Sequence, residues 1–151
     1  MATHYNGNQE HISTLNAFIK LMRASESVSS RLSRHLSEHN LTISQFGVLE
    51  ALLHLGSLNQ KELGQKLLKS GGNITLVIDN LQKRGLVERK TDPNDGRAYL
   101  IHLTKKGSEF ISTFFPMHLE KISEEFSVLS IEEKEELSAL CKKLGIRSDC
   151  P

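Results

Sequence analysis

The chain has 151 residues, enough for one domain, and its 38% apolar and 25% charged content is that of a globular protein. No run approaches the roughly 18–20 apolar residues of a membrane span, and the polar residues 1–9 lack a secretory pattern, so we interpret them as a disordered leader. The net charge is only +1, but residues 60–106 carry ten basic and five acidic side chains, whereas residues 107–151 carry five and nine. This basic middle favours a polyanion-binding surface, although a chance excess on solvated faces gives the same count.

Apolar residues recur every three to four positions from residue 10 to residue 39, which predicts one long amphipathic helix. Its stripe consists of Ile12, Leu15, Ile19, Met22, Val28, Leu32 and Leu36. A helix of this length buries little of itself against a small domain. We therefore expect it to pair with another subunit.

Capping motifs set the next two helix starts. TISQ at residues 42–45 fits a capping box before a helix that ends near Gly56. NQKE at residues 59–62 begins a short third helix that ends around Leu68.

A fourth helix follows almost at once. Ser70 can cap it, and its apolar residues Ile74, Val77, Ile78 and Leu81 fall at i, i+3, i+4 and i+7. Gly85 is the left-handed stop expected just past its end. Only residues 69–71 separate the third and fourth helices. Two short helices joined by so tight a turn indicate a helix-turn-helix.

The pattern then changes from helical to extended. LVERK at residues 86–90 and AYLIHL at residues 98–103 are typical of β-strands, and TDPNDGR at residues 91–97 is rich in turn residues. These segments predict a β-hairpin with Arg97 and Asp95 at its tip.

The last third of the chain is helical again. Thr104 caps a further helix, in which Pro116 should cause a kink or a division. SIEE at residues 130–133 is another capping box, and the final helix ends at Gly145. Four of the six phenylalanines lie in residues 110–126, where we expect core or interface residues rather than a base-stacking platform.

The fourth helix buries one stripe, so another face must point outward. That face consists of small or polar residues and one leucine: Ser70, Gly71, Gly72, Asn73, Thr75, Leu76 and Asn80. Small side chains permit close approach to a major groove, and amides and hydroxyls read base edges. We expect Asn73 to bond adenine, Thr75 to contact a phosphate or thymine methyl, and Leu76 to contact a thymine methyl. A flexible helix start at the glycines and core packing of Leu76 are the alternatives.

Cationic side chains surround this helix. Lys83 and Arg84 are expected to hold phosphates. Arg97 at the hairpin tip suits a narrow minor groove, where the potential is most negative, and Asp95 is expected to orient its guanidinium as a fork-to-carboxylate pair. The alternative is a plain salt bridge that stiffens the turn. The preceding helix-turn-helix favours the DNA contact.

Nearly the whole chain, residues 10–146, resembles the MarR-type winged-helix transcription regulators. The motifs that carry the resemblance are LTISQFGVL (41–49), LGQKL (63–67), SGGNITLVIDNLQKRGLVER (70–89), DPNDGR (92–97) and LTKKG (103–107). It implies a mainly α fold with a small β-hairpin wing, in which a winged helix-turn-helix is joined to a helical dimerisation region. The single domain then has dimerisation helices at 10–39 and 105–146, a DNA-binding part at 42–103 and a tail at 147–151.

The resemblance also implies a function. It indicates a homodimer that regulates transcription, as a repressor that binds a palindromic operator in double-stranded DNA and is released by a small effector or by thiol oxidation. The cysteine usage, with two residues near the C-terminus and no metal or redox motif, indicates a cytoplasmic, reduced protein. Aromatic compounds are among the candidate effectors. The implied pocket lies between the first, second and fifth helices. Its candidate residues are Met22, His35, Phe46 and His54, and core packing is the alternative for each of them.

Two departures from the family limit what carries over. Many relatives have basic or bulkier residues where this chain has Gly71, Gly72 and Leu76, so a base preference is not transferred. Relatives that sense peroxide use a cysteine near the start of the first helix, and this chain has none there. Cys141 is interpreted as a small core residue and Cys150 as part of a frayed tail.

Other chemistries find little support. The sequence contains no nucleophile elbow, phosphate loop or HExxH motif, so we expect neither an enzyme nor a cofactor. His35 and His39 have a spacing that can bind a metal, but no third ligand is apparent nearby, and we expect no metal site. A winged-helix module that binds a protein partner, or a thiol- or metal-responsive regulator, is the alternative function.

Overall fold

The computed structural model describes residues 2–67 and 71–146. Within them the chain forms six helices, as the sequence predicted, and one three-stranded antiparallel sheet, of which the sequence predicted the two strands of the hairpin. The elements are α1 (Gln9–Glu38), α2 (Ile43–Leu55), β1 (Leu58–Asn59), α3 (Gln60–Leu67), α4 (Gly71–Lys83), β2 (Val87–Asp92), β3 (Asp95–Leu103), α5 (Lys105–Glu125) and α6 (Ile131–Gly145). Among these helices, none is both long and apolar enough to cross a lipid bilayer.

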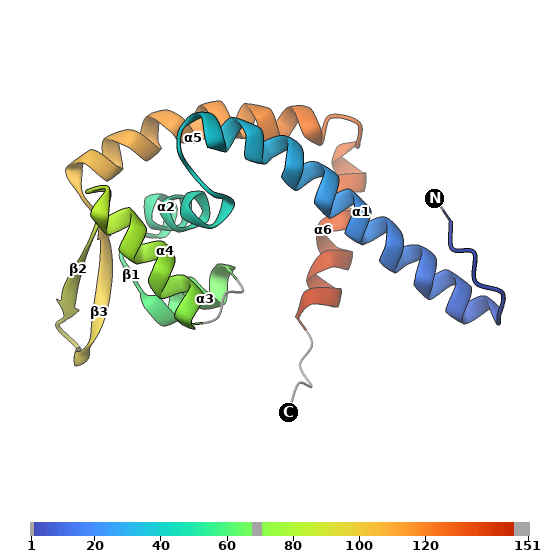
Figure 1. Cartoon of the computed structure of the whole chain (residues 1–151), viewed down its shortest axis with the longest axis horizontal. Coiled ribbons are helices and arrows are strands. Elements are labelled where there is room, and N and C mark those ends of the chain that lie inside the picture. Colours follow the sequence, from blue (N-terminus) through green and yellow to red (C-terminus); the bar gives the residue numbers. More distant parts are fainter. Residues whose placement is uncertain (1, 68–70, 147–151) are drawn as a thin grey trace.

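Two long helices form the frame of the molecule. Figure 1 shows α5 and the C-terminal half of α1 side by side, with α2, α3 and α4 beneath them and the β2–β3 wing at one end. The N-terminal half of α1 extends away from this group, and α6 turns back and crosses α1 in this view. The core lies where α2, α4, α5 and the sheet meet, and its fully buried residues include Leu49, Leu63, Ile78, Ile101 and Ile111. Both α2 and β3 thus pack directly against α5.

The predicted capping motifs begin their helices. The Thr42 hydroxyl accepts a hydrogen bond from the Gln45 N–H (3.1 Å), and the Gln45 side chain accepts one from the Thr42 N–H (3.1 Å). The same reciprocal pairing joins residues 59 and 62 before α3, and residues 130 and 133 before α6. Each pair satisfies two N–H groups that have no partner inside the helix.

The sequence reading missed one strand. The two-residue strand β1 pairs with β3, with Leu58 opposite Ile101 and Asn59 opposite Leu100, so the strand order is β1-β3-β2. Two residues are too few to show an alternation of apolar and polar side chains. As a consequence of this pairing, the wing is the outer part of a sheet that is anchored between α2 and α3.

The base of the wing depends on a close approach of two backbones. Gly85 ends α4 with a φ of 73°, and its carbonyl oxygen accepts a hydrogen bond from the Thr104 hydroxyl (2.6 Å). The Thr104 N–H donates to the Leu86 carbonyl (3.1 Å). A Cβ atom on Gly107, in the first turn of α5, would overlap that same carbonyl of Leu86. Only glycine allows α5 to begin this close to the wing.

Pro116 does not divide α5, which continues from Lys105 to Glu125. The residue lies on the exposed side of the helix and removes one backbone hydrogen bond. Ile111 and Phe114 before it and His118 after it are buried on the opposite side. Burial on both sides of the proline therefore keeps the helix continuous.

Gly107→Ala is expected to lower the free energy of unfolding by at least about 2 kcal/mol, because the added methyl meets backbone rather than a movable side chain. Gly96→Ala in the wing is the matched control, since its Cβ position has nothing within 4 Å. Urea unfolding followed by circular dichroism measures both. Equal midpoints for the two variants would contradict the close approach.

Candidate nucleic-acid interface

The orientation of α4 is fixed by its buried stripe. Ile74, Ile78 and Leu81 are buried, and Val77 is half-buried against the same core. Their spacing matches the helical repeat, so they hold one face of α4 against the domain. The opposite face is thereby presented to solvent.

The outer face carries the residues that the sequence predicted for base reading. Leu76 is 60% exposed, which rules out the alternative that it is a core residue. Asn73 and Thr75 are exposed and Asn80 is half-buried. Gly71 begins the helix, and the predicted cap Ser70 lies outside the described residues. A helix with this surface offers short polar groups and one apolar contact to a groove.

The wing presents Arg97, but Asp95 acts differently from the prediction. The Asp95 carboxylate accepts a hydrogen bond from the backbone N–H of Arg97 (3.0 Å). Within residues 2–67 and 71–146, no ion pair joins Asp95 to the Arg97 guanidinium. At a spacing of two residues the backbone N–H is the nearer donor, as in an Asx-turn. Asp95 therefore shapes the turn, and the Arg97 side chain is exposed.

The basic residues at the end of α4 separate into two roles. Lys83 is exposed and remains a candidate for phosphate contact. Arg84 instead donates from Nη1 to the carbonyl of Asn40, the residue with a φ of 56° just after α1. The expected phosphate role of Arg84 is thus replaced by a structural one, which ties α4 to the junction of α1 and α2.

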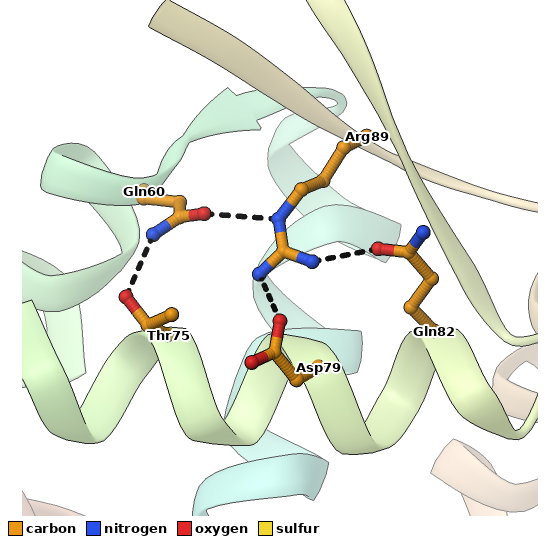
Figure 2. A network of polar contacts seen from close by, with 5 residues as sticks. All are labelled: Gln60, Thr75, Asp79, Gln82 and Arg89. Carbon is orange, nitrogen blue, oxygen red and sulfur yellow. Dashed lines mark hydrogen bonds and ion pairs between the residues drawn. The ribbon is translucent and has the colours of Figure 1, made fainter.

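Arg89, which the sequence analysis overlooked, connects the wing to helices α3 and α4 (Figure 2). Arg89 of β2 donates from Nε to Gln60 Oε1 (3.1 Å) and from Nη1 to Gln82 Oε1 (2.7 Å). Its Nη2 forms an ion pair with Asp79 Oδ1 (2.6 Å). Gln60 in turn donates from Nε2 to the hydroxyl of Thr75 (3.1 Å).

This network sets the angle between the wing and α4. A guanidinium is planar and presents its donors in a fixed fork, so three acceptors around it hold their elements in one arrangement. The sequence contains a signal for this network. Arg89 is two residues from the buried Val87, so both side chains lie on the same face of β2. Asp79 and Gln82 are three apart on α4 and so face the same neighbour.

Comparisons with known proteins agree with this geometry. The sequence profile of the MarR family matches residues 39–98. The HTH-type transcriptional regulator YkoM of Bacillus subtilis is 38% identical, over 93% of this chain and 92% of its own. The chain belongs to the MarR family. MhqR, an HTH-type transcriptional regulator of the same organism, is 36% identical over 89% of this chain and 93% of its own. The crystal structure of the S. aureus MepR–DNA complex matches with a TM-score of 0.73 and 25% identity, over 84% of this chain and 94% of that one.

As a member of the MarR family, the protein is a DNA-binding transcriptional regulator and not an enzyme, as the sequence predicted. The family profile spans the helix-turn-helix and most of the wing. The alignments with the two relatives extend beyond the profile, over about nine-tenths of the chain. The MepR structure matches 84% of the chain, so the fold is shared over most of its length.

The four candidate effector residues of this MarR-family chain are only partly brought together. His35 of α1 stacks on Phe114 (ring centroids 5.3 Å apart), and Phe46 of α2 contacts Phe114 edge-on (5.9 Å). His54 joins the same series of rings through Phe115, which stacks on Phe46. Met22 lies more than three helical turns from His35 along α1, and its side chain is 53% exposed. Phe114 and Phe115, absent from the predicted set, link the other three.

His118, which the sequence analysis did not single out, is also buried in this cluster. His118 of α5 lies with its Nδ1 2.9 Å from Nδ1 of His35, and it contacts Phe46 edge-on. Burial lowers the pKa of His118 below its ordinary value, and the nearby His35 and His39 lower it further. Burial also lowers the pKa of His35, with His39 adding to the effect. Two imidazole nitrogens form such a hydrogen bond when one carries the proton and the other a lone pair.

A double-mutant cycle on Asp79 and Arg89 tests the bracing of α4. Asp79→Ala and Arg89→Ala are each expected to lower the free energy of unfolding, and their coupling energy should be about 1 kcal/mol, because the pair is only partly shielded from solvent. Urea unfolding of the four proteins gives this value. Additive effects of the two substitutions would show that the ion pair contributes nothing. The exposed pair Lys90–Glu88 provides a control cycle, for which the coupling should be smaller.

Proposed function

We propose that this MarR-family protein is a cytoplasmic homodimer that represses transcription by holding a palindromic operator in duplex DNA. In each subunit α4 lies in the major groove and the wing reaches the flanking minor groove. The observation that carries the proposal is the pairing of an exposed reading face on α4 with an exposed Arg97 on the wing. Both belong to residues 60–106, whose net charge is +5.

Each predicted DNA-binding residue then has a role that fits its exposure. Asn73 bonds adenine, Thr75 contacts a phosphate or thymine methyl, and Leu76 packs on a thymine methyl. Lys83 binds a phosphate, Arg97 enters the minor groove, and Asp95 holds the turn that presents it. The proposed set also includes Gly71, Gly72 and Asn80 of α4, and Ser70, which lies outside the described residues.

The homodimer is supported by apolar side chains on the outer helices. Phe18 and Leu21 of α1 and Leu137, Leu140 and Leu144 of α6 are exposed. A groove of about 520 Å³ runs between α1, α6 and the end of α5. Exposed apolar surface on this scale marks an interaction site. Pairing through it places two reading helices about one turn of DNA apart, which makes the preferred site a palindrome.

Release by a small effector is the remaining part of the proposal. The cluster of His35, Phe46 and Phe114 joins α1, α2 and α5, and the predicted residue His54 extends it. An aromatic effector in this region would change the spacing between the dimer helices and the helix-turn-helix. It lowers DNA affinity only if it binds the DNA-free arrangement more tightly than the bound one.

Arg97→Ala is expected to weaken binding to a palindromic duplex about 10- to 100-fold, because each dimer loses two minor-groove contacts of roughly 1 kcal/mol or more. Arg23→Ala, an equally exposed arginine on α1, is the control for the loss of charge and should bind as the unmodified protein does. Fluorescence anisotropy with a duplex selected from genomic fragments provides the measurement. Equal affinities for the two variants would refute the wing contact.

The salt dependence of the same titration separates DNA binding from the alternative of a protein-binding module. The logarithm of the association constant should fall linearly with the logarithm of salt concentration, with a slope of roughly −0.9 per phosphate contacted. Lys83→Ala should reduce the steepness by about two contacts, one from each subunit of the dimer. A flat dependence would favour a protein partner.

Leu140→Glu should convert the dimer to monomers at micromolar concentration, because it places a charge in the apolar face of α6. Leu140 is 58% exposed and Leu55, at the end of α2, is 55% exposed, so Leu55→Glu is a matched control that should remain dimeric. Sedimentation equilibrium distinguishes the two states. A stable dimer of Leu140→Glu would place the subunit contact elsewhere.

A further inference from the structure

Three potential metal ligands lie together at the C-terminal end of α1. His35, Glu38 and His39 have the spacing i, i+3, i+4, which places their side chains on one face of the helix. One ligand atom from each residue lies within 4.8 Å of the other two. Both histidines are half-buried and Glu38 is exposed, so a cation has access from solvent.

Both histidine rings are already held through Nδ1. His39 Nδ1 is 3.2 Å from the backbone carbonyl of His35, to which it donates. His35 Nδ1 is 2.9 Å from Nδ1 of the buried His118 on α5. When His35 donates in that bond, each of the two α1 rings keeps a lone pair on Nε2. Metal-binding histidines commonly use their second ring nitrogen in this way, which fixes the orientation and the protonation of the ring.

We propose that His35, Glu38 and His39 bind one divalent cation of the zinc class, with His118 as the positioning residue that orients His35. Two imidazoles and one carboxylate are ligands that suit zinc, whereas magnesium and calcium prefer oxygen ligands alone. The three ligands leave the fourth tetrahedral position open to water or to another ligand. Ligand atoms in such a site are about 3.3 Å apart, so the three side chains draw together on binding from their present separation of up to 4.8 Å.

The surroundings favour a fixed site over a pair of surface histidines. His35 stacks on Phe114, its ring meets that of His118 edge to edge through the Nδ1–Nδ1 hydrogen bond, and the His39 ring centroid lies 4.7 Å from that of Phe114, so both rings are packed against neighbours. Rings that are held by packing and by a hydrogen bond at Nδ1 lose little further conformational freedom on binding a cation. The site is independent of the DNA-binding surface, because none of its residues belongs to α3, α4 or the wing.

Titration of the full chain with Co²⁺, followed by visible absorption, tests the proposal. We expect one Co²⁺ per chain with the d–d bands of a four-coordinate ion, and displacement of those bands by Zn²⁺. His39→Ala should abolish the bands and Glu38→Gln should weaken binding at least tenfold. His11→Ala removes an exposed histidine from the other end of the same helix and should bind as the unmodified protein does. Binding by His39→Ala equal to that of the unmodified protein, or no saturable binding at one ion per chain, would overturn the proposal.

His118→Phe separates positioning from packing, because phenylalanine preserves the ring in the buried cluster and removes the hydrogen bond to His35. The affinity for Co²⁺ should fall about 10- to 100-fold, as is typical when an outer partner of a metal ligand is lost. Circular dichroism of the metal-free variant checks that it folds. If it does not fold, the Glu38→Gln and His39→Ala variants still test whether the metal site exists. Unchanged affinity in a folded His118→Phe would remove His118 from the site. These readouts need no DNA, so they are separate from the Arg97→Ala test.

Discussion

The reading surface depends on the three acceptors that surround the guanidinium of Arg89. Gln60 belongs to α3, Gln82 and Asp79 belong to α4, and Arg89 itself belongs to β2. A groove-reading helix is useful only if its angle to the wing is fixed, because the two must meet adjacent grooves of one duplex. Apolar packing alone positions α4 through Ile74, Ile78 and Leu81 but is tolerant of small rotations. The directional bonds of Arg89 restrict that rotation.

The second constraint is the continuity of α5. Its first turn lies against the backbone of Leu86 at the base of the wing, and its middle buries Phe114 and His118 against α1 and α2. The same helix therefore touches the DNA-binding half at one end and the outer helices along its length (Figure 1). Gly107 and Thr104 make the first contact possible. The aromatic cluster forms the second contact, with α1 and α2.

Most local features of the structure were predicted from local features of the sequence, although Cys141, which was expected in the core, is exposed. Capping at Thr42 and Ser130, the left-handed Gly85 and the buried stripe of α4 each depend on residues within one or two helical turns. Contacts between distant segments were harder to predict. Arg89 meets Gln60 across 29 positions, and His35 meets His118 across 83, so neither pairing leaves a periodic pattern in the sequence. The role of Asp95 was misassigned because a two-residue spacing brings a carboxylate to a backbone N–H before it can reach a guanidinium.

The histidine and phenylalanine cluster is the place where the two halves of the molecule are coupled most directly. His35 comes from α1, Phe46 from α2, and Phe114 and His118 from α5, and each ring contacts at least one from another helix. His35 and Phe46 both contact Phe114 and His118, so a shift of α1 that displaces these two rings also displaces Phe46 and the helix α2 that carries it. In the proposed mechanism, a ligand that alters the spacing of α1 and α5 here acts on the reading helix α4 through α2. The strength of this coupling equals the difference in the ligand's affinity for the two arrangements, so even a tightly bound ligand leaves DNA binding unchanged unless it favours one of them.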